Sequence, residues 1–143
     1  MRFFLYGTLM AGIANPVAQD LHRRLRRGEP GSARGALFAI PDPDGWYPAL
    51  LADAAGGLVR GMIHEALPAF GAADLAALDA YEGAEYRRQA ISVGEGAQAL
   101  MAEAWLWRGP LPEHAVPLPH GDFARFLEER GLPVYAPREG YTG

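Results

Sequence analysis

Residues 86–107, YRRQAISVGEGAQALMAEAWLW, carry the clearest indication of the fold. A Gly-Glu-Gly turn at 94–96 separates two extended segments, 86–93 and 97–107, and this pattern predicts a β-hairpin. Side chains alternate between the two faces of a strand. In the second segment apolar residues occupy both faces, with Leu100, Ala102, Ala104 and Leu106 on one and Met101, Trp105 and Trp107 on the other. Such a strand is expected to be covered on both sides.

The segments on either side of this hairpin extend the sheet and add helices. We expect further strands at 2–6, 33–40, 46–51 and 58–66, and helices at 15–27, 72–82 and 122–130. The first helix begins at Asn15, a good N-cap, and ends at Gly28. Strands and helices do not alternate regularly. We therefore predict an α+β fold, a small, mainly antiparallel, curved sheet or β-barrel with about three flanking helices.

Length and composition indicate a single folded unit. The chain has 143 residues, of which 50% are apolar and 21% charged, as in globular proteins. We expect one domain over 1–143, with the Pro- and Gly-rich segment 132–143 as a tail of unassigned role. The N-terminal apolar run stops at Gly7, and no run approaches the roughly 20 residues of a membrane span. We therefore expect a cytoplasmic protein without a membrane partner.

Missing residue types exclude several kinds of chemistry. The chain has no cysteine, and all 13 of its cations are arginines, which excludes thiolate nucleophiles, Schiff-base lysines and P-loops. The four histidines lack the spacing of a metal site, so we expect no metal. A net charge of −4 argues against a nucleic-acid partner, and the arginine run at 23–27 suits the end of the first helix. Carboxylates, histidine, tyrosine or backbone groups remain as sources of catalysis.

Glu82 is the carboxylate in an unusual place. Residues seven apart on a helix lie about 20° from one another around its axis, so Glu82 projects beside Leu75 and close to Leu78. These leucines face the core if the helix packs at all, and the pattern carries a carboxylate into an apolar face. Burial raises the pKa of such a group toward neutrality, which suits a residue that takes and gives a proton.

Other interpretations of this helix remain open. A glutamate near a helix end is often solvated or paired with an arginine, and Arg87 and Arg88 follow closely in the sequence. Asp79 lies near the same apolar stripe and is a competing carboxylate. Glu85 follows the glycine that ends the helix and is expected in a loop.

The segment Tyr6-Gly7-Thr8-Leu9, called the 6–9 loop below, ends the first strand with a glycine. Glycine permits a left-handed turn and lets a ligand approach the backbone closely. Successive N–H groups in such a turn can hold a carboxylate. An ordinary strand-ending turn explains the same residues. From the other end of the chain, Tyr135 could cover a pocket and is kept as a supporting candidate.

Several blocks of sequence occur in a recognisable order between Tyr6 and about Leu127. The first is the 6–9 loop, and the others are Gly35-Ala36-Leu37-Phe38 with Tyr47-Pro48-Ala49-Leu50, Val59-Arg60-Gly61-Met62-Ile63, Leu78-Asp79-Ala80-Tyr81-Glu82-Gly83 followed by Tyr86 and Arg88, and Gly121-Asp122-Phe123. In order and spacing, these blocks resemble the γ-glutamylcyclotransferase-like family.

The resemblance implies a small barrel whose pocket is formed by the 6–9 loop and Glu82. It implies Glu82 as the catalytic residue and Tyr86 and Arg88 as supporting residues. The substrate-binding residues would be Tyr6, Gly7, Thr8 and Leu9. It also implies no cofactor and a small γ-glutamyl compound as the partner. The reaction would be a transferase- or lyase-type cyclisation of a γ-glutamyl amide or peptide to 5-oxoproline, with release of the amine.

The substrate and even the activity stay open at this point. Members of the family act on γ-glutamyl amino acids, glutathione or γ-glutamyl-ε-lysine, and the sequence does not choose among them. One alternative is a non-catalytic domain whose pocket binds a γ-glutamyl or amino-acid-like ligand. Another is a different amide-processing or acyl-transfer enzyme on the same scaffold, since a fold does not fix a substrate.

Overall fold

The computed structural model describes residues 1–10, 15–53 and 55–136, so residues 137–143 of the expected tail lie outside the described residues. The strands are β1 (Arg2–Leu5), β2 (Glu29–Asp42), β3 (Gly45–Ala52), β4 (Gly57–Glu65), β5 (Tyr86–Val93), β6 (Leu100–Trp107) and β7 (Val116–Pro117). The helices are α1 (Pro16–His22), α2 (Ala72–Glu82) and α3 (Phe123–Arg130), with a 3₁₀ turn, η1 (Gly96–Gln98), inside the β5–β6 hairpin.

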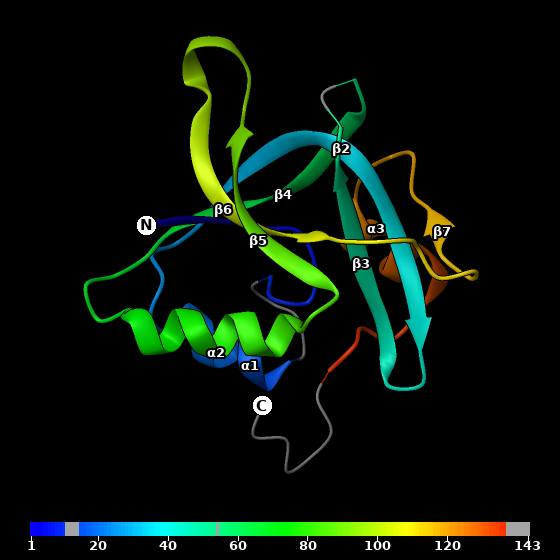
Figure 1. Cartoon of the computed structure of the whole chain (residues 1–143), viewed down its shortest axis with the longest axis horizontal. Helices are drawn as coiled ribbons and strands as arrows, with labels where there is room; N and C mark the ends of the chain where they lie inside the picture. Colours follow the sequence, from blue (N-terminus) through cyan, green and yellow to red (C-terminus); the bar gives the residue numbers. More distant parts are fainter. Residues whose placement is uncertain (11–14, 54, 137–143) are drawn as a thin grey trace.

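The strands form one curled sheet in the order β3-β2-β4-β1-β6-β5, with β7 paired to β2. Neighbouring strands are antiparallel except β1 and β6, which run parallel. The curl brings β3 against β6 and gives the sheet the form of a half-barrel (Figure 1). This architecture confirms the predicted α+β fold with a mainly antiparallel, curved sheet and three helices.

β1 is buried on both faces because a hydrophobic core lies on each side of it. Phe4 and Tyr6 join the inner core of the half-barrel, which α3 completes with Phe123. Phe3 and Leu5 join the outer core, where α1 and α2 cover the sheet. The alternation of side chains along one short strand therefore connects both layers of the fold, and the loop that follows β1 is anchored from both sides.

β6 shows the predicted apolarity on both faces, but only along part of its length. Ala104 and Leu106 belong to the inner core, and Trp105 to the outer core. Leu100 and Met101 are 41% and 58% exposed, because the hairpin extends beyond the rest of the sheet at its tip (Figure 1). The expectation of cover on both sides is therefore wrong for these first two residues of the strand.

Helices cover both faces of the sheet. Leu21 of α1 and Leu78 of α2 lie in the outer core, while Phe126 of α3 packs edge-on against Trp46 of β3, with 5.4 Å between ring centroids. Among the described residues, no helix is long and apolar enough to span a membrane.

The first helix is shorter than predicted. Asn15 caps it as expected, accepting a hydrogen bond from a backbone N–H at 2.9 Å, but the helix ends at His22. Leu25 is buried, as the apolar stripe requires, yet it lies in an extended segment that bridges to Ala66 beyond β4. Strand-like pairing thus ends the helix early, and the whole arginine run at 23–27 follows its last residue.

The segment after α3 returns to the sheet. Trp46 forms a parallel bridge with Val134, and its N–H donates to the carbonyl of Pro133 at 2.9 Å. The N–H of Tyr135 in turn donates to the carbonyl of Trp46 at 2.7 Å. These bonds hold Tyr135 beside the start of β3.

Candidate functional site

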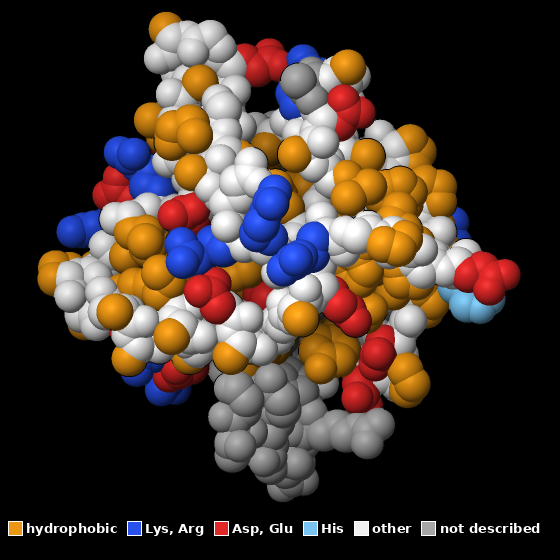
Figure 2. Space-filling view, in the orientation of Figure 1, with side chains coloured by type: hydrophobic (Ala, Val, Ile, Leu, Met, Phe, Trp, Pro, Cys, Tyr) orange, Lys and Arg blue, Asp and Glu red, His pale blue; other side chains and the backbone are white. Residues whose placement is uncertain are grey.

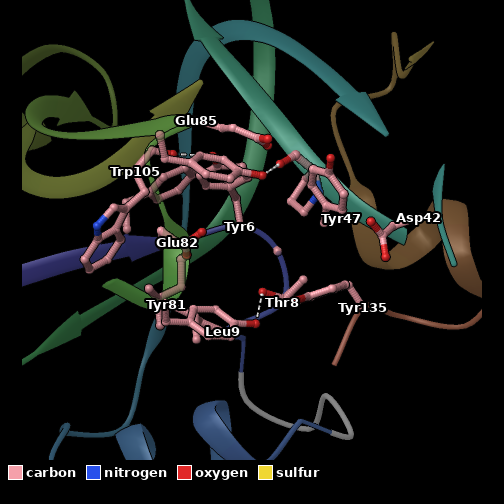
Figure 3. A pocket seen from close by; sticks show the side chains of 15 residues that line it. Tyr6, Thr8, Leu9, Asp42, Tyr47, Tyr81, Glu82, Glu85, Trp105 and Tyr135 are labelled. Carbon is pink, nitrogen blue, oxygen red and sulfur yellow. Dashed lines mark hydrogen bonds between the residues drawn. The ribbon is translucent and has the colours of Figure 1, made fainter. Parts of the chain in front are cut away.

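One pocket brings most of the predicted site residues together (Figure 3). Its walls come from the 6–9 loop, the C-terminal end of α2, the starts of β3 and β5, and β6. Glu82, Tyr86 and Tyr135 all line it. The cavity has a volume of about 190 Å³, which is smaller than the pockets that hold drug-sized ligands.

Glu82 is the last residue of α2, and the chain turns away directly after it. Gly83 has a φ of 84°, a left-handed conformation that strongly favours glycine, and this residue ends the helix. The Glu82 carboxyl points into the cavity toward the backbone that follows β1 (Figure 3). Burial raises its pKa from 4.5 to about 8, and the charge of Asp79 contributes a smaller part of the increase. Within the described ranges, no arginine forms an ion pair with Glu82.

The arginine expected near Glu82 is engaged elsewhere. Arg88 pairs with Asp79 at 3.1 Å and with Glu103 at 3.2 Å, and it does not line the pocket. The same Asp79 oxygen accepts a hydrogen bond from the Trp105 indole at 2.9 Å. This network ties the exposed side of α2 to β5 and β6. It leaves Glu82 on the pocket side of the helix without a cationic partner in the described part of the chain.

The 6–9 loop lines the same cavity. No described residue accepts a hydrogen bond from the N–H of Gly7, Thr8 or Leu9, whereas the Gly7 carbonyl accepts one from Met10 at 3.1 Å. Gly7 does not have the expected left-handed backbone, because its φ is not positive. A Cβ on Gly7 would instead lie 2.2 Å from Cγ of Pro48, so close packing against β3 requires a glycine here.

Tyr81 fastens the loop to the helices. Its hydroxyl lies 2.9 Å from Oγ1 of Thr8 and accepts a hydrogen bond from Nδ2 of Asn15 at 2.7 Å. Burial raises the pKa of Tyr81 to about 12. One neutral phenol therefore joins α2, the cap of α1 and the 6–9 loop.

Two further tyrosines line the pocket near Glu82, and each donates its hydroxyl proton to a backbone carbonyl. The Tyr6 hydroxyl donates to the carbonyl of Trp105, and the Tyr86 hydroxyl donates to the carbonyl of Pro48 at 2.5 Å. Burial, followed by charges that include Glu82, raises both pKa values well above the usual value of 10. These hydroxyls therefore remain neutral and hold the walls of the pocket.

Several lining residues were not among the predicted site residues. Tyr81 is adjacent in sequence to Glu82, which was a usable signal, and Trp105 was interpreted as core. The others are Phe4 and Leu5 of β1, Asp42 at the end of β2, Tyr47 and Pro48 of β3, and Glu85 in the turn before β5. In the described part of the chain, no cluster of three or more His, Asp or Glu could hold a metal ion.

The fold and the pocket together define an α+β half-barrel with a cavity sized for a small molecule. The family model described as "Gamma-glutamyl cyclotransferase, AIG2-like" matches residues 3–125. The chain therefore belongs to this family, and membership supports a γ-glutamyl cyclotransferase-like activity on small molecules. No curated protein matches the chain.

Solved structures from several organisms share the fold. An AIG2-like protein from Mus musculus superposes with a TM-score of 0.72 at 24% identity, covering 98% of this chain and 97% of its own. The protein c4763 of uropathogenic E. coli gives 0.68 at 24% identity, with 89% and 94% covered. YkqA from Bacillus subtilis gives 0.68 at 19% identity. That match covers 91% of this chain and 42% of the longer YkqA chain. At these identities the likeness establishes the fold alone.

Proposed function

We propose that this chain cyclises a γ-glutamyl amide to 5-oxoproline and releases the amine, with Glu82 as the general acid and base. The observation that carries the proposal is the Glu82 carboxyl, which lines a small cavity with the 6–9 loop and has a pKa raised to about 8 by burial. A group with a pKa near the working pH is suited to accept and return a proton in one turnover.

The reaction needs no nucleophile from the protein. The free α-amine of the glutamyl group attacks its own γ-carbonyl carbon, and the new N–C bond closes a five-membered ring. The bond from that carbon to the leaving nitrogen then breaks. Ionised Glu82 takes the proton lost by the attacking amine and delivers it to the leaving nitrogen, so the carboxyl ends as it began. A chain without cysteine or lysine can therefore perform the step.

The 6–9 loop supplies the complementary polar groups. The loop lines the cavity, and the N–H groups of Gly7, Thr8 and Leu9 have no acceptor among the described residues. They are suited to bind the substrate carboxylate or the oxygen of the reacting carbonyl. The link through Tyr81 keeps these donors in position relative to α2, which reduces the freedom that the substrate must lose at the barrier.

Arg88 is assigned a positioning role within this proposal. It contacts Asp79 and Glu103 rather than the cavity, so it acts on Glu82 through the geometry and charge of the network. Tyr86 and Tyr135 are wall residues that shape the space for the substrate.

The test is 5-oxoproline release by the Glu82→Gln variant, with a panel of γ-glutamyl amides as substrates and cyclised product measured by mass. We expect the rate to fall by about 10² to 10⁴, the usual contribution of a positioned acid or base. Glu113→Gln is the matched control, because Glu113 is exposed and lies outside the pocket. A Gln variant that retains the wild-type rate would remove Glu82 from the mechanism.

The competing function is a pocket that binds such a compound without turnover. It predicts thermal stabilisation of the wild-type chain by a γ-glutamyl amide with no 5-oxoproline formed after prolonged incubation.

A further inference from the structure

The outer half of the pocket has a different chemical character from the end where Glu82 lies. Glu82 and Trp105 lie at one side of the cavity, while Tyr47, Asp42 and Tyr135 lie at the other (Figure 3). If the glutamyl group is processed at Glu82, the leaving amine occupies the remaining space, along this second wall. A role of this wall in binding the leaving amine rests on the proposed function.

Two carboxylates border this outer half. Asp42 ends β2 and Glu85 precedes β5, and both side chains are exposed at the pocket mouth. Figure 2 shows acidic side chains gathered over the turn between β2 and β3. Among the described residues, no arginine forms an ion pair with Asp42 or Glu85, and no Arg or His lines the cavity.

The charges of both carboxylates affect the same pocket residue, Tyr47. The pKa of the Tyr47 hydroxyl is raised to about 12, first by burial and then by the charges of Glu85 and Asp42. Tyr47 belongs to β3, between the two acids, so its hydroxyl senses a negative potential from each side. A cation in this part of the cavity would be stabilised by that potential, and an anion would be repelled.

Aromatic rings complete the wall. Tyr47 and Tyr135 meet edge to face with 5.9 Å between centroids. Tyr135 is fixed there by its backbone bond to Trp46. Aromatic faces attract ammonium groups, and they also pack against the methylene chain that carries one.

We propose that Asp42, Glu85 and the Tyr47–Tyr135 pair select γ-glutamyl amides whose leaving amine carries a second, positively charged amino group at the end of an aliphatic chain. Leaving groups that end in a carboxylate are disfavoured. The covalent step is the cyclisation described above, and the released product is an aliphatic diamine or a longer polyamine. The reaction that supplies such a substrate is the joining of a diamine to the γ-carboxyl of glutamate.

The experiment compares three γ-glutamyl amides of similar length that differ in the end of the leaving amine. The leaving amines are 1,4-diaminobutane, n-pentylamine and 5-aminopentanoate, which are cationic, neutral and anionic at that end. We expect wild-type kcat/KM to follow that order. In Asp42→Asn and Glu85→Gln, the ratio of the diamine amide to the neutral amide falls by about twofold to fivefold each, as expected for exposed charge contacts. The double variant shows the larger loss, and Glu113→Gln shows none.

Equal kcat/KM for all three amides, a preference for the carboxylate-ended amide, or an unchanged ratio in the double variant would overturn the selectivity while leaving cyclisation intact. Absence of product from every amide would instead refute the proposed function. In that case calorimetric affinities of the same three amides for the wild-type chain still decide the charge preference, with the same order expected.

Discussion

Replacing Glu82 by glutamine should make the protein more stable at alkaline pH, although it removes the proposed catalytic group. The pKa of this carboxyl is raised on folding, from 4.5 to about 8. Its protonated form is therefore the one that the native state favours. Stability associated with Glu82 is fully present below pH 4.5, declines as the pH rises, and is lost above about pH 8. Glutamine imitates the protonated carboxyl at every pH.

The size of the effect follows from the two pKa values. Each unit of difference between the folded and unfolded pKa corresponds to about 1.4 kcal/mol. The interval from 4.5 to about 8 thus corresponds to about 5 kcal/mol at pH 9, and to about 1 kcal/mol at pH 5, where the unfolded chain is only partly ionised. Water that reaches the half-buried side chain through the pocket reduces both values, so these are upper limits.

Urea denaturation of both proteins between pH 5 and pH 9 measures this difference directly. Subtracting the wild-type free energy of unfolding from that of Glu82→Gln cancels the titration of the other groups. The difference should grow with pH and level off above about pH 8. Asp79→Asn is the companion variant, because it removes the smaller electrostatic cause and should move the midpoint to lower pH. A difference that stays constant across the range would show that Glu82 titrates as an ordinary surface carboxyl.

Three further predictions concern catalysis and the loop. The kcat/KM for cyclisation should rise about tenfold per pH unit below the pKa of Glu82, about 8, and then level off, and a flat profile would contradict its role as base. Gly7→Ala places a methyl group 2.2 Å from Pro48 and should cost about 1–3 kcal/mol in denaturation, whereas Gly57→Ala meets nothing within 4 Å. Equal costs would refute this account of Gly7. Tyr81→Phe should cost about 1 kcal/mol and lower kcat/KM, and unchanged values of both would show that its hydroxyl does not hold the loop.

The sequence predicts the direction of Glu82 because that direction depends on local geometry. Helical periodicity relative to Leu78 and a helix-ending Gly83 are both visible in a single segment, and the structure has both. The apolar residues on both faces of β6 are likewise visible in a single segment, and they predict a sheet covered on both sides in an α+β fold. Local patterns of this kind do not reveal that His22 ends the first helix, because the early ending depends on a bridge from Leu25 to distant Ala66.

The remainder of the pocket depends on contacts between distant segments. Arg88 is close to Glu82 in the sequence, yet its place on β5 directs it to Asp79 and Glu103. Tyr47 and Tyr135 meet only because the segment after α3 pairs with β3. A glycine such as Gly7 is visible in the sequence. The reason that a glycine is needed there is the close approach of Pro48, which depends on the curled sheet.

The parallel pairing of β1 with β6 has a consequence for biosynthesis. β1 lies between β4 and β6, with Arg2 opposite Glu65 and Phe3 opposite Glu103. On the ribosome, β2 can pair with β3 and β4 soon after they emerge, and β1 can pair with β4, whereas the partner of β1 on its other side, β6, is made much later. Such long loop closures slow folding. We therefore expect the nascent chain to acquire its binding site last, after the strand that completes the sheet has left the exit tunnel.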